Sequence, residues 1–426
     1  MTYNELFELA QNKGFNNIQV TEETKKENSI YLINKKIEDY TDCEKTTYTV
    51  KAEKDGKTEQ IYTEYLDASI VDLLLEKILE TESKYEDTYL DINKNNTIDE
   101  EVNIDIKEEL ELLKNLNYEK EKYEKVQSLE TAYSDTYTKT RIVNNKGVDI
   151  ATSSRNYELY VEASAKENDK IATYSESTLS SNKKEINIKR IVENALTLAT
   201  LGTKKKRLEN KKYNIVLNNK VASFILNELQ KMLSAEAVHQ KKTCLENKKN
   251  EKVFSNKLTI VEEPLNKKYP GYTVFDKEGT NTINKILIEN GTIKNYLYDI
   301  KEAIIDKVES TGNKYNGIGT RNMFIVPGIK SLEELFNEMQ DGIYITNYLG
   351  SMGSSINISS GNISFQVFGY IIENGKLVSG FEPAIITTSI FELFSNIEDI
   401  GNDLKFSTRT VASPSLYIKE ISISGE

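Results

Sequence analysis

The stretch ILIENGTIKNY, residues 286–296, places Asn290-Gly291 between two runs in which apolar and polar residues alternate. Asn-Gly readily adopts the positive φ angles that a two-residue hairpin turn needs, so the stretch predicts two antiparallel strands. The stretch YIIENGKLVSG at 370–380 repeats the pattern. Two hairpins this short resemble each other by chance too often to indicate an internal duplication.

Glycine and proline are concentrated around these hairpins. All five prolines lie after residue 263, and only four of the 20 glycines come before it. Because both residues mark tight turns, the last third is predicted to be rich in turns and mostly β. Further strand-like segments are FSNKLTIVEEP, TRNMFIVPG and SLYIKEISISG. A mostly antiparallel sandwich or curled barrel over 206–426, with one long helix at about 219–246, is the expected architecture.

The first part of the chain predicts an α+β domain over 1–205. Thr2 and Glu5 form a capping-box pattern before a short helix that ends at Gly14. Asp67 is expected to cap a helix, and Lys54-Asp55-Gly56-Lys57 to form a hairpin turn. Strands are predicted at 17–22, 29–40, 45–53, 58–65, 127–143, 148–153, 157–163 and 170–176, and helices at 107–125 and 185–201. The whole chain is therefore predicted to be α+β, with antiparallel pairing.

Composition restricts the partners. The 426 residues carry a formal net charge of -12, which argues against direct binding to nucleic acid. The nearest basic cluster, Lys204-Lys205-Lys206-Arg207, is interpreted as a solvated linker. No signal peptide or membrane-spanning stretch is recognised, and Cys43 and Cys244 do not suggest a disulfide framework. We expect a cytoplasmic protein that does not bind membranes.

The stretch DINKNNTIDEEV, residues 91–102, resembles a calcium-binding loop. Asp91, Asn93 and Asn95 occupy the first, third and fifth positions. However, Asn96 replaces the usual glycine, and Val102 replaces the carboxylate that completes the site. The stretch is therefore predicted to be a polar connecting loop.

His239 is the only histidine, in the stretch EAVHQKKTC at 236–244. On the predicted helix, Glu236 and His239 share a face, whereas Cys244 lies roughly 140° from His239. A helical zinc site of the protease type needs two histidines and a glutamate that activates water. His239 can be a metal ligand, a polar residue that faces an internal cavity, or a surface or packing residue. The pattern favours the last.

Other catalytic arrangements are equally hard to find. A catalytic Ser-His or Cys-His pair would also have to use His239. There is no glycine-rich phosphate loop and no dinucleotide-binding fingerprint. The residues by themselves predict an acidic α+β protein without visible catalytic machinery.

The order of motifs in the second half resembles the PmbA/TldE branch of the TldD/PmbA family, also described as modulators of DNA gyrase. The motifs are AEAVHQKKTCL, VFSNKLTIVEEP, FDKEGTNT, LIENGTIKNYLYD, ESTGN, GYIIENGKLV, GNDL and VASPSLYIKEISISG. The resemblance covers about 235–425, and the α+β pattern of the first part is compatible with it.

This resemblance implies a two-domain fold and a dimeric shell around a cavity in which unfolded peptides are cut. The catalytic partner, TldD, is a metalloprotease with a His-Glu-x-x-x-His helix and a late cysteine ligand. Here the matching stretch, Ala235–Gln240, keeps only Glu236, with His239 one place away, and residues 410–415 contain no cysteine. Because a zinc that activates water needs a preorganised three-ligand site, the departures predict no metal in this chain and zinc only in a TldD-like partner.

The predicted function is a non-catalytic subunit of a cytoplasmic metalloprotease complex for proteolysis or peptide maturation. The chain would pair with a TldD-like protease, or with itself, and present strand edges to an extended peptide. Five residues match family motifs and are either turn residues or residues near the cavity: Asp276, Glu278, Thr311, Gly312 and Asn313.

Two alternatives stay open. The chain could be an active metallopeptidase with unusual ligands, among them Glu236 and His239. It could also be a stand-alone homodimeric binding module, or influence gyrase indirectly.

Overall fold

The structure is a computed structural model that describes residues 1–82, 104–117, 119–349, 356–407 and 410–425. The calcium-loop-like stretch at 91–102 lies outside these residues, so its interpretation stays a prediction. No helix in the described ranges is long and apolar enough to cross a membrane. Cys43 and Cys244 are both free cysteines.

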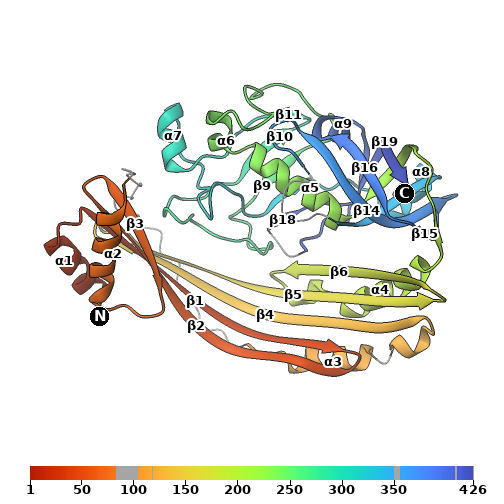
Figure 1. The fold of residues 1–426 in the computed structure, drawn as a ribbon, viewed down its shortest axis with the longest axis horizontal. Coiled ribbons are helices and arrows are strands. Elements are labelled where there is room, and N and C mark those ends of the chain that lie inside the picture. The colour runs from red at the N-terminus through yellow and green to blue at the C-terminus, as the bar shows by residue number, and fades with distance from the viewer. Residues whose placement is uncertain (83–103, 118, 350–355, 408–409, 426) are drawn as a thin grey trace.

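An antiparallel six-stranded sheet dominates the chain up to Ser180 and curves beneath the rest of the molecule (Figure 1). The strand order is β3-β2-β1-β4-β5-β6. The strands are β1 (Asn17–Ile33), β2 (Lys36–Lys54), β3 (Lys57–Thr63), β4 (Val126–Asn144), β5 (Asp149–Glu167) and β6 (Lys170–Ser180). The predicted hairpin turn between β2 and β3 is confirmed, because Asp55 and Gly56 have φ angles of 54° and 75°.

Some predicted strand boundaries were wrong. The segment 29–40 contains a turn at Asn34-Lys35, where both residues have positive φ angles, so it belongs to two strands. The segments 148–153 and 157–163 are parts of one strand, β5. The polar residues between them stay paired with β4, and Arg155 contacts Asp135 of β4 at 2.6 Å. A polar interruption did not end the strand because its backbone hydrogen bonds were still satisfied.

Helices cover both ends of this sheet. The capping box of α1 (Tyr3–Asn12) is confirmed, and α1 packs with α2 (Ser69–Glu80) over a core that includes Leu6 and Leu74. At the other end lie α3 (Lys107–Leu116), the short 3₁₀ helix η1 (Glu119–Lys122), the 3₁₀ helix η2 (Lys183–Glu185) and α4 (Ile188–Gly202). The predicted helix at 107–125 was too long, since α3 ends at Leu116. One hydrophobic core joins α4, the curved sheet and residues of the C-terminal strands.

Two further sheets form the C-terminal part. One has the order β11-β10-β9-β12-β18, and the other β13-β8-β19-β16-β14-β15-β7, with β17 paired to β19. The strands are β7 (Lys205–Lys206), β8 (Lys211–Leu217), β9 (Ile260–Glu262), β10 (Lys285–Glu289), β11 (Thr292–Ile293), β12 (Met323–Ile325), β13 (Gly342–Leu349), β14 (Asn362–Glu373), β15 (Lys376–Phe381), β16 (Ala384–Ser389), β17 (Ile397–Ile400), β18 (Val411–Ala412) and β19 (Leu416–Gly425). Both sheets contribute to a single core around α5 (Asn219–Met232).

The predicted Asn-Gly hairpins are confirmed. They connect β10 with β11 and β14 with β15, and the asparagines and glycines of both turns have positive φ angles. Three of the pairings in these sheets are parallel: β12 with β18, β13 with β8, and β15 with β7. The remaining pairs are antiparallel, and the mixture of helices and sheets confirms the α+β class.

The predicted long helix at 219–246 was wrong. It divides into α5 and the single-turn α6 (Ala235–His239), and Cys244 lies beyond both. Ser234 is extended and forms an isolated parallel bridge with Leu297, while the N–H group of Ala235 donates to the Leu297 carbonyl at 2.9 Å. A tertiary backbone contact thus replaces the next helical hydrogen bond. The other helices of this part are α7 (Ile300–Asp306), α8 (Leu332–Met339) and α9 (Ile390–Ser395).

The basic run at 204–207 is more ordered than a solvated linker. Lys205 and Lys206 form β7, which pairs with β15, and the Lys206 ammonium lies 3.0 Å from the Glu373 carboxylate. The division of the chain into domains at about residue 205 stays a prediction.

Candidate functional site

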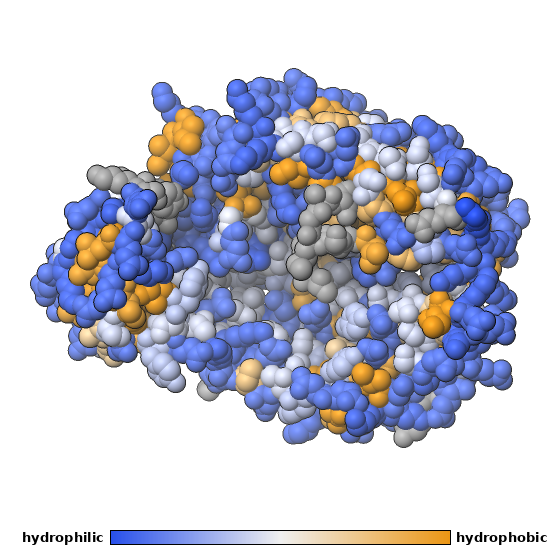
Figure 2. All heavy atoms as spheres, viewed as in Figure 1, coloured by the Kyte–Doolittle hydropathy of each residue, from blue (hydrophilic) through white to orange (hydrophobic). Residues whose placement is uncertain are grey.

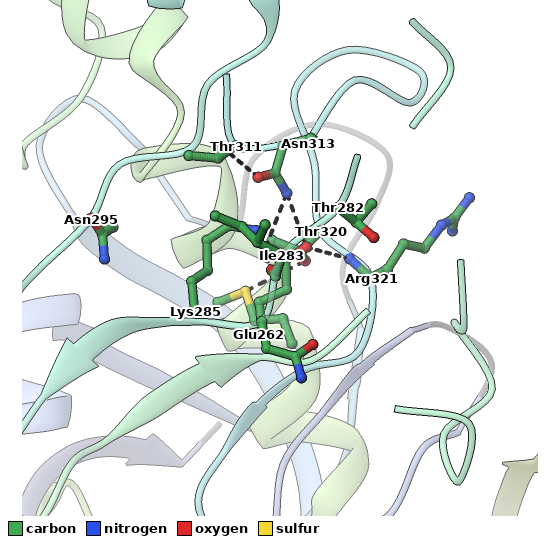
Figure 3. Close-up of polar contacts among 12 residues, drawn as sticks. Glu262, Thr282, Ile283, Lys285, Asn295, Thr311, Asn313, Thr320 and Arg321 are labelled. Carbon is green, nitrogen blue, oxygen red and sulfur yellow. Dashed lines mark hydrogen bonds and ion pairs between the residues drawn. The ribbon is translucent and has the colours of Figure 1, made fainter. Parts of the chain in front are cut away.

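A buried polar cluster surrounds Glu262, the last residue of β9 (Figure 3). Lys285 of β10 forms an ion pair with its carboxylate at 2.6 Å, and the two side chains are only 0% and 6% exposed. The Asn313 amide donates to both carboxylate oxygens at 2.9 and 3.1 Å, and the backbone N–H of Arg321 donates at 2.8 Å. The strands β9 and β10 and the loop region over 313–321 are thereby joined at one point.

Electrostatics explain why this cluster needs so many donors. Burial raises the pKa of the Glu262 carboxyl, while Lys285 and the amide donors lower it and offset part of that effect. An isolated charge in such surroundings would cost several kcal/mol. The cluster is therefore a satisfied ion pair that fixes the loop containing Asn313.

The two loops singled out in the sequence lie next to each other. The Asp276 carboxylate accepts the N–H groups of Glu278, Thr280 and Lys314 at 2.9 to 3.0 Å. In the other loop, the Thr311 hydroxyl donates to Asn313 at 2.6 Å. Through Lys314, the first loop is thus attached to the loop that holds Glu262.

Gly312 is a structural requirement of its loop. It has a φ angle of +68°, and a Cβ atom there would lie 2.5 Å from the Asn281 carbonyl oxygen. A side chain would therefore be strained by its backbone conformation and would also clash. Gly312 and Asn313 are both buried, which places them behind the surface.

Asp276 is a titratable group of these loops whose pKa is strongly shifted. Burial raises its pKa to about 7, although the three backbone donors act in the opposite direction and Glu278 adds to the rise. The carboxyl therefore changes charge near neutral pH. Its charge is therefore coupled to that of Glu278, which lines the cavity described next.

A cavity of about 810 Å³ lies between these loops and the curved sheet. Glu278, Lys277, Lys314 and Tyr315 line it from the loops. Its other wall consists of Gln19, Thr21, Glu23, Thr47, Thr49, Lys51, Thr58, Glu59, Gln60 and Tyr62. Of the five predicted residues, Glu278 lines this cavity, whereas Asp276, Thr311, Gly312 and Asn313 support it from behind. Figure 2 shows the surface hollowed between the sheet and the C-terminal part.

Glu236 and His239 lie elsewhere, on α6. Glu236 is exposed, and its carboxylate accepts a hydrogen bond from Gln240 at 3.0 Å. His239 lies between two carboxylates of α7: Nδ1 contacts Glu302, and Nε2 lies 2.9 Å from Asp306. Burial lowers the pKa of His239, but the two carboxylates outweigh it and the net pKa is raised. Through these two contacts the imidazole attaches α6 to α7.

Glu262 and Lys285 were missed by the sequence analysis. Both are charged residues that lie next to apolar residues in short strands. The available signal was a charge in an apolar strand, which indicates a buried partner without identifying it. Across the described ranges, no group of three or more His, Cys, Asp or Glu side chains is arranged to hold a metal ion.

Comparisons with known proteins support one family. Residues 210–425 match the PmbA/TldA metallopeptidase C-terminal domain, and residues 99–202 match the central domain of the same family. A metalloprotease of Methanocaldococcus jannaschii is 27% identical over 336 residues, which are 75% of this chain and 72% of the relative. The metalloprotease PmbA of Escherichia coli O157:H7 is 26% identical over 230 residues, or 54% of this chain and 49% of the relative.

Solved structures share the whole fold. A proposed modulator of a DNA gyrase from Thermotoga maritima has a TM-score of 0.87 and 28% identity, with 99% of both chains covered. TldE from Thermococcus kodakarensis, at 18% identity and a TM-score of 0.84, shares the fold over 99% of each chain. Since the matched C-terminal model alone spans more than half of the residues, this chain belongs to the PmbA/TldD family of metallopeptidase-like proteins.

Proposed function

We propose that this chain is a non-catalytic, TldE-like subunit of a cytoplasmic TldD/TldE-type metalloprotease complex that acts on unfolded peptides. The observation that carries this proposal is the state of its only histidine. Both ring nitrogens of His239 are in contact with carboxylates, so neither is available to a metal without breaking the α6–α7 contact. The zinc would be held by a TldD-like partner.

The helix that would hold a family-type metal motif supports the same proposal. The stretch Ala235–Gln240, which matches the six positions of the His-Glu-x-x-x-His motif, extends past the end of α6, because α6 has only five residues. A second six-residue stretch has glutamate at the second position of the motif. It is Asn227–Met232, which lies on the 14-residue α5. Neither stretch has histidine at its first or last position, so neither fits a two-histidine zinc helix.

An exposed apolar group on α7 supports contact with another subunit. Ile304 and Ile305 are 65% and 56% exposed, and Val308 follows them at 46%. Figure 2 shows this orange group at the upper left, over α7. Exposed apolar clusters are common where proteins associate.

Co-expression with a TldD-like protein tests the proposal. We expect a stable complex by size-exclusion chromatography, and cleavage of an unstructured peptide by the complex but not by this chain alone. His239→Ala should leave that cleavage largely intact, because the imidazole has only a structural role. Complete loss of cleavage by a folded His239→Ala complex would contradict the non-catalytic assignment.

The alternative of an active metallopeptidase is favoured by one observation, the metalloprotease names of the relatives. Metal analysis of the purified chain distinguishes the two. Stoichiometric zinc or iron together with peptide cleavage by the isolated chain would establish the alternative. A homodimer that recovers no protease partner would instead indicate a stand-alone binding module.

A further inference from the structure

Two cations, Lys277 and Arg321, lie beside the cavity between the loops and the curved sheet, near enough for the Arg321 charge to act on Lys277. Lys277 lines the cavity, and its ammonium donates to the Asn316 side chain at 2.7 Å. Arg321 packs its guanidinium over the ring of Tyr315, 4.4 Å from the centroid, and Tyr315 lines the same cavity. Figure 3 shows the Arg321 side chain extending away from the buried Glu262 cluster.

Neither cation has a carboxylate in contact among the residues that the structure describes. Burial lowers the pKa of Lys277, Glu23 raises it, and the Arg321 charge lowers it further. The nearby cations in the same loops are different, since Lys285 is paired with Glu262 and Lys314 with Asp299. Two like charges held together in this way favour an anion between them.

The fold fixes the backbone from which both side chains extend. The backbone N–H of Arg321 is bonded to buried Glu262, and the backbone N–H of Lys277 donates to the Lys314 carbonyl at 2.8 Å. A side chain on a fixed backbone loses less entropy when it binds a ligand. The backbone at both residues is thus fixed by contacts that do not use the side-chain charges.

The opposite wall indicates what else the anion must carry. Gln19 is 3% exposed, yet its Oε1 atom has no hydrogen-bond partner, and its amide makes only a long contact of 3.5 Å with the Lys277 carbonyl. A buried acceptor of this kind needs a donor. Glu23 is a second acceptor on this wall. A multiply charged phosphate would meet Glu23 and Glu278, whereas a peptide brings N–H donors together with a carboxylate.

We propose that this cavity is a subsite for a peptide carboxylate, in which Arg321 and Lys277 bind the carboxylate and Gln19 accepts an N–H of the same peptide. The inference rests on the proposed peptide-binding function and names its recognition element. The volume of about 810 Å³ lies within the range of small-ligand sites, roughly 300 to 1,000 Å³. Arginine is suited to this role because its planar fork matches a carboxylate.

Fluorescence anisotropy on the isolated full-length chain tests the subsite. The probes are labelled Gly/Ser-rich peptides in three forms: a free C-terminus, an amidated C-terminus, and an amidated C-terminus with one internal Asp. The variants are Arg321→Gln, Lys277→Gln and the double variant. The matched control is Lys294→Gln, a surface lysine that pairs with Glu289 and does not line the cavity.

We expect the wild-type chain to bind the free carboxylate about 10- to 100-fold more tightly than the amidated probe without Asp, as for loss of a charge-assisted hydrogen bond. Arg321→Gln should abolish most of this difference, and Lys294→Gln should retain it. Recovery of affinity with the internal Asp indicates that the subsite accepts any carboxylate, and no recovery indicates the C-terminus. Thermal unfolding of each variant verifies that the fold is retained.

Equal affinity for free and amidated probes, or no measurable binding of either, would overturn the subsite. So would a double variant that still discriminates between them. Failure to form a complex with a TldD-like protein would leave this assay unaffected, so the two proposals can fail independently.

Discussion

Two ionic clusters in the C-terminal part use similar groups in different surroundings. In the cluster around Glu262, the carboxylate and the Lys285 side chain are 0% and 6% exposed. In the cluster around His239, the imidazole is 21% exposed and Asp306 is 39% exposed, although Glu302 is only 6% exposed. The first joins strands inside the core, and the second attaches two short helices at the surface.

The difference teaches that burial, more than the number of contacts, decides what such a cluster contributes. Removing one partner of a buried pair leaves a charge that water cannot reach, whereas water replaces a lost partner near the surface. Loss of a partner in the Glu262 cluster should therefore lower the free energy of unfolding strongly, and loss of a partner in the His239 cluster should lower it less.

Glu262→Gln should lower the free energy of unfolding by about 3–5 kcal/mol, because Lys285 would remain charged in the core without a carboxylate. Chemical denaturation measured by circular dichroism provides the test. The matched control is Glu289→Gln, which removes a carboxylate from the exposed pair with Lys294. Similar losses in the two variants would contradict the role of burial.

Asp276 is a buried carboxyl group whose effect on stability should depend on pH. Its folded pKa of about 7 lies above the usual 3.8, so the folded state holds the proton over a range in which the unfolded chain has released it. The free energy of unfolding should therefore fall as pH rises from about 4 to 7, by roughly 1.4 kcal/mol for each pH unit at most, and then level off. Denaturation at a series of pH values should show this decrease in the wild type and a smaller one in Asp276→Asn.

His239→Ala should cost about 1 kcal/mol at pH 6, because the imidazole and its partner Asp306 are partly exposed. The folded pKa of His239 is raised, so its contribution is complete below the unfolded value near 6.5 and is lost as pH rises through the folded pKa. The difference between wild type and variant should therefore shrink at pH 9. A constant difference across this range would mean that packing, and not charge, is lost.

The smallest effect is expected at the surface. Lys294→Ala breaks the pair with Glu289, whose side chains are 40% and 44% exposed, and should change the free energy of unfolding by less than about 0.5 kcal/mol. Added salt should make this effect smaller still, because dissolved ions screen a pair that is surrounded by water. A cost above about 1 kcal/mol would show that exposure does not rank these clusters.

The local signals predicted much of the fold. Asn290-Gly291, Asn374-Gly375 and Asp55-Gly56 marked three hairpin turns correctly. The capping box at Thr2 and Glu5 also formed as expected. Such signals succeed because the relevant angles and hydrogen bonds involve residues within about four positions of each other.

The candidate site was predicted less completely. Family motifs drew attention to Asp276, Glu278 and the Thr311–Asn313 loop, which the structure brings together beside a cavity. The central pair of Glu262 and Lys285 was not recognised, and neither was Arg321. Their roles depend on contacts across 23 to 59 residues of sequence, which no local pattern encodes.

The sequence by itself therefore determined the Asn-Gly and Asp-Gly turns and the α+β class, because these depend on backbone angles and on the period of apolar residues. Tertiary structure decided the break between α5 and α6 and the surroundings of each charged side chain. The break depends on the bond from Ala235 to Leu297, and the clusters depend on burial. Both arise only when distant segments pack together and exclude water.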